Sequence, residues 1–344
     1  MCGIVGYIGY RDAWPIVIKG LHRLEYRGYD SAGVALMNGT LNIYKKAGKV
    51  RDLEESAKHS NLSGTVGMGH TRWATHGAPS DRNSHPHTSG DSRIAIIHNG
   101  IIENYSTLKE ELKQRGHVFS SDTDTEVLVH LIEQIQNETG LDLLEAVRIA
   151  LNEVIGAYAI VIMSKDSPDE IIAARKGSPM VIGVGDGEYF VASDASPIVE
   201  YTKNVIYLKD NEIAYIKRNE LLIKSVDNVV QTPYIQQLEL KLEMLEKGGY
   251  DHFMLKEIYE QPRSIYDCMR GRIYPNQGLV QLGGIKEYAE KLKNIDRIVI
   301  VACGTSWHAG LVGEYLIEEY ARIPVEVEYA SEFRYRNPVI NKGD

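Results

Sequence analysis

Met1-Cys2-Gly3-Ile4-Val5-Gly6 opens the chain and places a cysteine directly before a short apolar run, Ile4 to Ile8. Cysteine is small enough to let the initiator methionine be removed, which would leave Cys2 with both a thiol and a free α-amine. Because the thiol has a pKa of ~8.5 and the α-amine one of ~8, the amine can act as a base for its own side chain. This arrangement is the N-terminal variant of a nucleophile–base pair. From this stretch alone, an ordinary buried cysteine on a first strand remains the alternative.

The composition is that of an acidic globular protein. With 344 residues, 43% of them hydrophobic, more than one domain is expected. The net charge of −9 argues against a nucleic-acid binder. Cys2, Cys268 and Cys303 lie far apart without a CxxC pair, so neither a disulfide framework nor a zinc site is supported. We expect a cytoplasmic protein without a membrane segment, because neither a signal peptide nor an apolar run of about 18 residues is present.

Short apolar runs separated by Gly, Asp and Pro turns predict many antiparallel strands up to about residue 225. These runs are Ile4–Ile8, Ile94–His98, Ala157–Met163, Ile171–Ala174, Val181–Val184, Tyr189–Ala192, Val205–Leu208, Ile213–Ile216 and Leu221–Lys224. Glu126 to Ile135 has apolar residues on one helical face. Residues 1–225 are therefore expected to form an α/β domain with two sheets sandwiched between helices.

The pattern changes after residue 225. Residues 226–290 are predicted to be a linker with leading helices, including an amphipathic helix over Gln237–Lys247 and a helix start or kink at Pro262. From Ile295 a β-α-β pattern begins a doubly wound parallel sheet. Its parts are Arg297–Val301, Trp307–Arg322 and Val325–Glu328. Because two strands and one helix cannot cover both faces of such a sheet, residues 291–344 are expected to be an incomplete domain and the chain the front part of a longer protein.

The run from His70 to Gly77 concentrates polar and aromatic side chains, and nothing in it suits a core strand. The Arg72 guanidinium is suited to bidentate hydrogen bonding with a carboxylate, and Trp73 could cover a pocket. A structural loop is one alternative. Another is a two-histidine metal site, which we disfavour because no carboxylate or cysteine lies at ligand spacing. Its candidate ligands would be His70 with His76, or His85 with His87.

Three further segments carry possible chemistry. His98-Asn99-Gly100 ends a predicted strand with donors suited to an oxyanion hole, although a plain turn is the alternative. The segment 121–126 opens a helix, so its acidic residues could cap the helix, or one aspartate could bind an ammonium group. Ala302 to Ser306 joins a strand to a helix and could bind phosphate there, although it lacks the P-loop lysine and a GxGxxG motif.

Together these segments resemble the glutamine–fructose-6-phosphate aminotransferase family, within the class II glutamine amidotransferases. The resemblance extends over nearly the whole chain. It is carried by residues 2–6, 24–33, 70–77, 98–104, 123–126, 256–262, 303–306 and 330–336.

The resemblance implies an N-terminal-nucleophile hydrolase domain, a four-layer α/β/β/α sandwich, followed by a truncated sugar-isomerase (SIS) domain. It further implies hydrolysis of L-glutamine, passage of ammonia through a channel, and amination of fructose 6-phosphate to glucosamine 6-phosphate. No metal or organic cofactor is implied, and the complete enzyme is expected to be a homodimer.

The roles implied for individual residues follow the family's motifs. Cys2 would be the nucleophile, with Asn99 and Gly100 as the oxyanion hole. Arg72, with Thr75 nearby, would bind the α-carboxylate of glutamine, and Asp124 would bind its α-ammonium group. His76 and His85 would be loop and pocket residues of this site, and Trp73 would be the channel gate. Cys303, Gly304, Thr305 and Ser306 would hold the sugar phosphate.

One departure limits the second half of the resemblance. The family's Ser-Gln-Ser-Gly-Glu-Thr phosphate loop is absent, so we expect this chain to carry the glutamine-hydrolysing half of the reaction. Two alternatives remain. One is another class II amidotransferase, such as amidophosphoribosyltransferase, whose phosphoribosyl-pyrophosphate signature is missing. The other is a non-catalytic phosphosugar-binding module.

Overall fold

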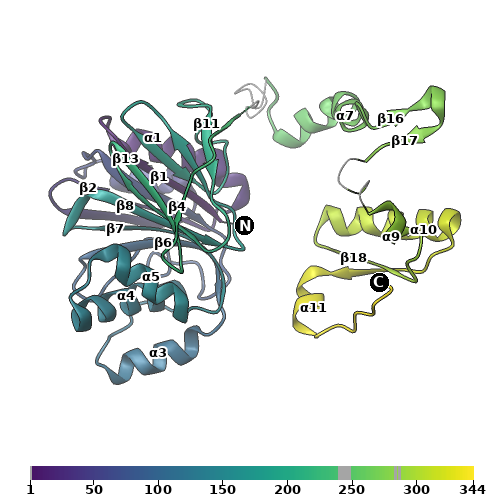
Figure 1. The fold of residues 1–344 in the computed structure, drawn as a ribbon. Helices are drawn as coiled ribbons and strands as arrows, with labels where there is room; N and C mark the ends of the chain where they lie inside the picture. The colour runs from purple at the N-terminus through teal and green to yellow at the C-terminus, as the bar shows by residue number, and fades with distance from the viewer. Residues whose placement is uncertain (1, 239–248, 283–284, 286–287) are drawn as a thin grey trace. The chain divides into compact units, whose positions relative to one another are not determined.

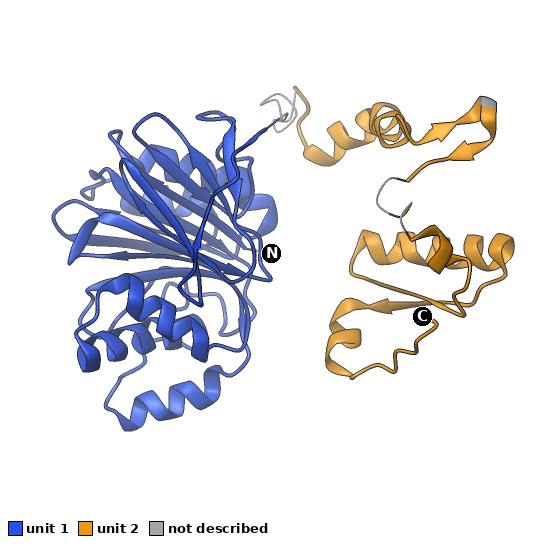
Figure 2. Ribbon diagram, viewed as in Figure 1, with its two compact units in different colours: residues 1–248 blue, residues 249–344 orange. Residues whose placement is uncertain are grey.

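Residues 2–238, 249–282, 285 and 288–344 are described by the structure, a computed structural model (Figure 1). They fall into two compact units, residues 1–248 and 249–344, which are treated separately below (Figure 2). Most of the helix predicted over Gln237–Lys247 lies outside the described residues. Within the described part of the chain, no helix has the length and apolar character needed to span a membrane.

Two antiparallel sheets form the first unit. The eight-stranded sheet has the order β15-β11-β9-β10-β1-β4-β2-β3. Its strands are β1 (Gly3–Ile8), β2 (Ser31–Met37), β3 (Leu41–Ala47), β4 (Val66–Arg72), β9 (Val181–Val184), β10 (Tyr189–Ala192), β11 (Asn204–Tyr207) and β15 (Gln236–Gln237). The seven-stranded sheet has the order β14-β13-β12-β8-β7-β6-β5. Its strands are β5 (His87–Thr88), β6 (Ile94–Ile102), β7 (Gly156–Ser164), β8 (Ser167–Lys176), β12 (Glu212–Lys217), β13 (Glu220–Ser225) and β14 (Val230–Gln231).

Helices cover the outer faces of both sheets, which confirms the four-layer sandwich (Figure 1). The helices of this unit are α1 (Ala13–Leu24), η1 (Glu25–Arg27), α2 (Val50–Ala57), α3 (Tyr105–Gln114), α4 (Thr125–Thr139) and α5 (Leu143–Glu153). One buried hydrophobic cluster lies between the sheets. It includes Ile4 of β1 from one sheet and Ile97 of β6 from the other. The other two clusters join α1 and α2 to the first sheet and α4 and α5 to the second. β14 and β15 extend these sheets beyond residue 225.

Two of the strands that differ from the sequence-based prediction, β6 and β4, contribute residues to the site. β6 does not end before Asn99 but continues through Gly100 to Ile102, paired with β7 from Ile94↔Ser164 to Ile102↔Gly156. The polar run that begins at His70 was not expected to form a core strand, yet its first residues complete β4 between β1 and β2. The central position of β4 satisfies its backbone on both edges, and the polar side chains find buried partners, as described below.

The second unit contains the predicted β-α-β pattern. Its elements are α7 (Phe253–Met269), β16 (Ile273–Tyr274), η2 (Pro275–Gln277), β17 (Leu279–Val280), α9 (Ala289–Leu292), β18 (Ile298–Ala302), α10 (Thr305–Ala321), β19 (Val325–Tyr329) and α11 (Ala330–Tyr335). β18 and β19 pair in parallel, as predicted, and Gly310 lets α10 pack closely against Val327 and Ile300. Pro262 lies inside α7 and not at its start.

Ile97 provides a test of the packing between the two sheets. Its side chain is fully buried between them, two residues before Asn99. We expect Ile97→Ala to lower the free energy of unfolding by about 2–5 kcal/mol, because the lost methyl groups leave a cavity that the sheets cannot close. Urea unfolding followed by circular dichroism measures this. Ile155→Ala, at a position that is 61% exposed, is the matched control and should change stability by less than about 0.5 kcal/mol. Equal effects of the two substitutions would contradict the buried position of Ile97.

Candidate active site

Cys2 lies immediately before β1, in the middle of the eight-stranded sheet. β1 is paired on both edges, with β4 and β10, and the Ser193 hydroxyl accepts a hydrogen bond from the Ile4 N–H at 3.0 Å. The Trp73 N–H donates to the Cys2 Sγ at 3.2 Å. The thiol therefore lies between the first residue of β1 and the loop that follows β4.

The surroundings of Cys2 favour the neutral thiol. Burial raises its pKa and is the largest influence, while the Trp73 N–H and the Arg72 charge act in the opposite direction without reversing it. A thiol with a raised pKa needs a base before it can attack a carbonyl carbon. An α-amine on the same residue would supply that base.

Asn99 reaches Cys2 from the other sheet. Its Nδ2 donates to the Cys2 carbonyl oxygen at 3.1 Å. The orientation of this amide is set by His70, whose Nε2 lies 3.0 Å from the His98 carbonyl oxygen and 2.9 Å from Asn99 Oδ1. Burial lowers the pKa of His70 to about 3, so the ring is neutral at physiological pH. Because a carbonyl oxygen can only accept, Nε2 must carry the proton, and Asn99 must present its oxygen to His70 and its NH₂ to Cys2.

Gly100 follows Asn99 on β6 with a φ of +132°, a value that disfavours other residues. A Cβ at this position would lie 2.0 Å from the Ala157 carbonyl oxygen. The backbone can therefore adopt this conformation, next to the Asn99 side chain, only with glycine.

A group of buried histidines lies behind this pair of residues. The His70 and His85 rings are 4.1 Å apart, and the Thr125 hydroxyl contacts both His85 Nε2 at 3.0 Å and His98 Nδ1 at 2.9 Å. Burial lowers the pKa of both His85 and His98. His85, predicted as a pocket residue, is thus an uncharged interior group that links Asn99's partner His70 to the first turn of α4.

Arg72 ends β4 with a buried guanidinium. Its Nη2 donates to the carbonyl oxygens of His76 and of Gly77, the latter at 2.9 Å. Nη1 is buried without a hydrogen-bond partner, and no described carboxylate forms an ion pair with this side chain. Since unpartnered buried donors are uncommon, the free edge of Arg72 is suited to an anionic group of a ligand.

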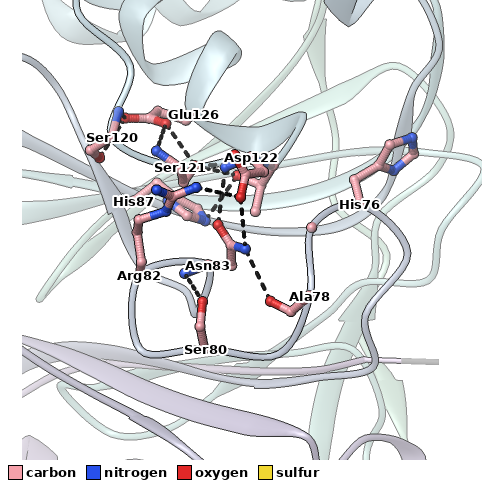
Figure 3. A network of polar contacts seen from close by, with 12 residues as sticks. His76, Ala78, Ser80, Arg82, Asn83, His87, Ser120, Ser121, Asp122 and Glu126 are labelled. Atoms are coloured by element: carbon pink, nitrogen blue, oxygen red, sulfur yellow. Dashed lines mark hydrogen bonds and ion pairs between the residues drawn. The ribbon is translucent and has the colours of Figure 1, made fainter.

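The loop after β4 is tied to the segment before α4 (Figure 3). Asn83 donates through Nδ2 to the Ala78 carbonyl oxygen at 3.0 Å and accepts from the Asp122 N–H at 3.0 Å through Oδ1. Arg82 forms an ion pair with Asp122. These contacts fix the ends of the loop that carries Thr75, an exposed residue, and His76, whose ring meets Tyr105 edge to face at 5.2 Å.

Asp124 precedes α4 but does not cap it. Its Oδ2 accepts from the Ile102 N–H at the end of β6 at 2.8 Å, and the side chain makes no capping hydrogen bond to the helix. The residue is buried, and its charge acts to raise the pKa of His98, against the effect of burial. The carboxylate is therefore held beside the strand that carries Asn99 and Gly100, as an ammonium-binding group would require.

The segment around Asp30, to which the sequence analysis assigned no role of its own, also supports the site. Asp30 Oδ2 accepts from the Ala74 N–H, and the Tyr29 ring packs edge-on against Trp73 at 5.4 Å. Trp73 itself is 49% exposed. Tyr29 and Trp73 are more than forty positions apart, so no local sequence pattern predicts their contact. The acidic side chain of Asp30 is the one signal in this turn that could have indicated a role in the site.

The second unit places the predicted phosphate loop at the start of α10. Cys303 and Gly304 connect β18 to the helix, and Thr305 and Ser306 lie in its first turn. Gly304 has a φ of +59°. All four residues are exposed, so the first N–H groups of the helix and two hydroxyls are accessible together.

A cysteine at the start of a central strand, facing an asparagine from the opposed sheet of a four-layer sandwich, defines an N-terminal-nucleophile hydrolase fold. A family model described as a glutamine amidotransferase domain matches residues 51–239, and one described as a SIS domain matches residues 291–344. The first match spans more than half of the chain, and the chain belongs to the glutamine amidotransferase family.

Curated relatives resemble the whole chain. Glutamine–fructose-6-phosphate aminotransferase (isomerizing) of Bacteroides thetaiotaomicron is 62% identical over 347 residues, which cover 100% of this chain and 56% of the relative. The enzyme of the same name from Chlorobaculum tepidum is 59% identical and is covered to 57%. The chain thus spans little more than half the length of these relatives.

Two solved structures have folds similar to that of this chain. The allosteric regulatory enzyme of purine biosynthesis matches with a TM-score of 0.58 and 30% identity, over 66% of this chain and 50% of that chain. Glutamine phosphoribosylpyrophosphate amidotransferase from B. subtilis matches with a TM-score of 0.59 and 24% identity, over 95% and 65% of the two chains, which shows the fold alone.

Proposed function

We propose that this chain hydrolyses L-glutamine to L-glutamate and ammonia, with Cys2 as the nucleophile. The observation that carries the proposal is the contact across the two sheets, in which Asn99 Nδ2 is turned toward Cys2 at 3.1 Å by the neutral His70. An amide nitrogen has two N–H bonds, so one remains to donate to a substrate oxygen while the other binds the Cys2 carbonyl.

The proposed reaction begins when the α-amine of Cys2 takes the thiol proton and Sγ attacks the side-chain amide carbon of glutamine. The oxygen of that amide gains negative charge, which the N–H groups of Asn99 and Gly100 stabilise. The C–N bond then breaks, and the leaving nitrogen takes the proton from the α-amine and departs as ammonia. Water hydrolyses the remaining glutamyl thioester, which releases glutamate and restores the thiol.

The rest of the site accounts for selection of an amino acid. The unpaired edge of Arg72 suits the α-carboxylate of glutamine, with Thr75 nearby, and the buried Asp124 suits its α-ammonium. His76 positions Arg72 through its main-chain carbonyl. The half-exposed Trp73, whose N–H contacts the Cys2 thiol, would act as the channel gate beside the nucleophile. The proposal assigns these groups to binding, and the bond-breaking steps to Cys2, Asn99 and Gly100.

The deciding experiment measures glutamate release from L-glutamine by protein whose N-terminal Cys2 has been verified by mass spectrometry, with and without fructose 6-phosphate. Steady release that saturates with glutamine supports the proposal. Absence of release from a folded protein with a verified Cys2 terminus would contradict it. Stimulation by the sugar phosphate would show in addition that residues 291–344 bind it and communicate with the glutamine site.

Arg72→Lys tests recognition of the substrate carboxylate. Lysine keeps the charge but loses the second, parallel hydrogen bond, so we expect KM for glutamine to rise roughly 10–100-fold, equivalent to about 1.5–3 kcal/mol. The kcat should change little, because the carboxylate is remote from the reacting amide and is bound equally in the ground state and the transition state. Arg51→Lys, on the exposed face of α2, is the control. A fall in kcat at unchanged KM would contradict the assigned role.

For the whole enzyme, we propose transfer of the released nitrogen to fructose 6-phosphate to form glucosamine 6-phosphate. The proposal is supported by the names of relatives up to 62% identical and by the SIS match over residues 291–344. Within this chain, Cys303, Gly304, Thr305 and Ser306 would contribute to the sugar-phosphate site through the exposed start of α10. Retention of added fructose 6-phosphate in equilibrium dialysis, lost on Ser306→Ala, would test this part.

We further propose a homodimer located in the cytoplasm, with neither nucleic acid nor membrane as partner. These points follow from the family resemblance and the acidic net charge of −9. Sedimentation equilibrium would test the assembly, and a mass of one chain across micromolar concentrations would contradict it.

A further inference from the structure

Three side chains converge at the middle of α4, away from Cys2 in the sequence and unused by the proposed reaction. His117 comes from the segment between α3 and α4, two helices labelled in Figure 1, and His130 and Glu133 lie one turn apart on α4. The His117 Nδ1 and His130 Nδ1 atoms are 3.1 Å apart, and Glu133 Oε2 lies 3.4 Å from the first and 3.3 Å from the second. These atoms form a nearly equilateral triangle.

Hydrogen bonding around His117 fixes which of its nitrogens carries the proton. Gln134 Nε2 donates to the Glu138 carboxylate at 2.7 Å, so Gln134 presents its oxygen to His117 Nε2, also at 2.7 Å. An amide oxygen only accepts, and therefore Nε2 is the N–H of His117. In the neutral ring, Nδ1 then carries a lone pair that points into the triangle.

His130 has a carboxylate on each side of its ring. Its Nε2 is buried without a hydrogen-bond partner and faces the Glu126 carboxylate at 3.7 Å, while Nδ1 faces Glu133 at 3.3 Å. With the proton on Nε2, toward Glu126, Nδ1 presents a lone pair to the triangle as well, and a cation at its centre would select this tautomer. The third corner, Glu133, is oriented by the Gly90 N–H at 3.0 Å and the Asp91 N–H at 3.2 Å.

The triangle thus consists of three electron-pair donors facing one another in a buried place. The side chains of His130 and Glu133 are 1% and 5% exposed. Glu126 and Glu133 lie on either side of His130. Within the described part of the chain, no lysine or arginine forms an ion pair with either carboxylate. Ser120 and Ser121 donate hydrogen bonds to Glu126, and two N–H groups donate to Glu133. A cation would add the opposite charge with which buried carboxylates are usually paired. A cation at the centre of the triangle would satisfy all three donors together.

We propose that His117, His130 and Glu133 bind a divalent zinc-class metal ion, with water as a fourth ligand. Zn–N and Zn–O bonds of about 2.0–2.1 Å in a tetrahedron separate the ligand atoms by about 3.3–3.4 Å, close to the observed sides. Two imidazoles and one carboxylate favour zinc, cobalt or nickel over magnesium and calcium, which prefer oxygen ligands. The Gln134 oxygen on His117 and the Glu126 carboxylate near His130 form the outer contacts typical of metal-bound histidines.

The competing explanation is a proton shared between the two histidines and the glutamate. A charged N–H···O⁻ bond is typically about 2.7–2.9 Å long, whereas both nitrogen–oxygen sides here are 3.3 Å or more. The geometry therefore favours a larger cation. Such an ion would join the segment after α3, the middle of α4 and the turn between β5 and β6.

The test is binding of zinc alone to the metal-free chain, measured by equilibrium dialysis with elemental analysis. We expect about one tightly bound ion per chain, lost in His117→Ala and in Glu133→Gln and retained in His59→Ala, an exposed-histidine control. Gln134→Ala should weaken binding roughly 10–100-fold by removing an outer contact. Circular dichroism of each metal-free variant would verify that it is folded.

Cobalt provides a second readout that does not depend on the variants. A tetrahedral nitrogen–oxygen site should give visible cobalt absorption without a thiolate charge-transfer band, which separates it from binding at Cys2, Cys268 or Cys303. Zinc should also raise the thermal midpoint of the wild-type chain and not that of His117→Ala. Equal zinc binding by the wild type and His117→Ala, binding accompanied by a thiolate band, or no zinc binding by the wild type would each overturn the proposal.

Discussion

Replacing Cys2 by serine is expected to abolish glutamate release, with kcat lowered by at least about 10³-fold. The serine hydroxyl has a far higher pKa than the thiol, so the α-amine generates much less of the nucleophilic anion from serine than from cysteine. The Trp73 N–H that contacts Sγ at 3.2 Å can still donate to the shorter hydroxyl side chain, so the fold should be preserved. Steady-state release of glutamate at saturating glutamine measures the effect.

Two control variants separate the thiol from the amine. Cys268→Ser alters an exposed cysteine of α7 and should retain full activity. An alanine inserted between Met1 and Cys2 keeps the thiol but converts its α-amine into a peptide nitrogen, so that the general base is lost. A general base contributes typically about 10²–10⁴-fold, and a loss of that size is expected. Normal turnover by the insertion variant would exclude the α-amine as the base.

Asn99→Ala is expected to lower kcat by about 10²–10³-fold with little change in KM. The donor acts on charge that develops only as Sγ attacks, and therefore it stabilises the transition state more than bound glutamine. Asn99→Asp should be at least as damaging, because it keeps an oxygen for His70 but places a second anionic oxygen opposite the developing charge.

The control for this pair of variants is Asn152→Ala, an exposed asparagine on α5, which should leave both constants unchanged. The readout that matters is the division between kcat and KM. A rise in KM with unchanged kcat in Asn99→Ala would show that the residue binds the substrate and does not stabilise the oxyanion.

Local patterns were sufficient to predict much of the first unit. β9 and β10 have the bounds that their apolar runs and flanking turns indicated. The helix predicted over 126–135 is the central part of α4. These elements are short, regular and bounded by glycine or acidic residues, so neighbouring residues alone determine them.

The missed strand shows where such reasoning fails. His70 looked incompatible with a core strand because an isolated polar side chain is costly to bury. Its partners, the His98 carbonyl and the Asn99 amide, come from the opposed sheet 28 and 29 positions away. The packing of two sheets, which no local pattern encodes, converts a polar residue of β4 into a buried support of the site.

The histidine–glutamate triangle illustrates the same limit. His130 and Glu133 stand three positions apart on one helix, a spacing visible in the sequence. His117 joins them only through the turn after α3, where its N–H donates to the Leu112 carbonyl at 3.0 Å. Without this third donor, which only the fold supplies, His130 and Glu133 are typical of an ordinary contact within a helix, and for that reason the sequence analysis considered a metal at other histidines and not at these.

The pairing of β1 has a consequence for the order in which the protein is made. β1 is synthesised before both of its neighbours, β4, which ends at Arg72, and β10, which ends at Ala192. The strand that follows Cys2 can therefore be enclosed on both edges only after residue 192 has been made. Until then Cys2 would lack its assembled surroundings, so the proposed hydrolysis of glutamine would require the sandwich to close first.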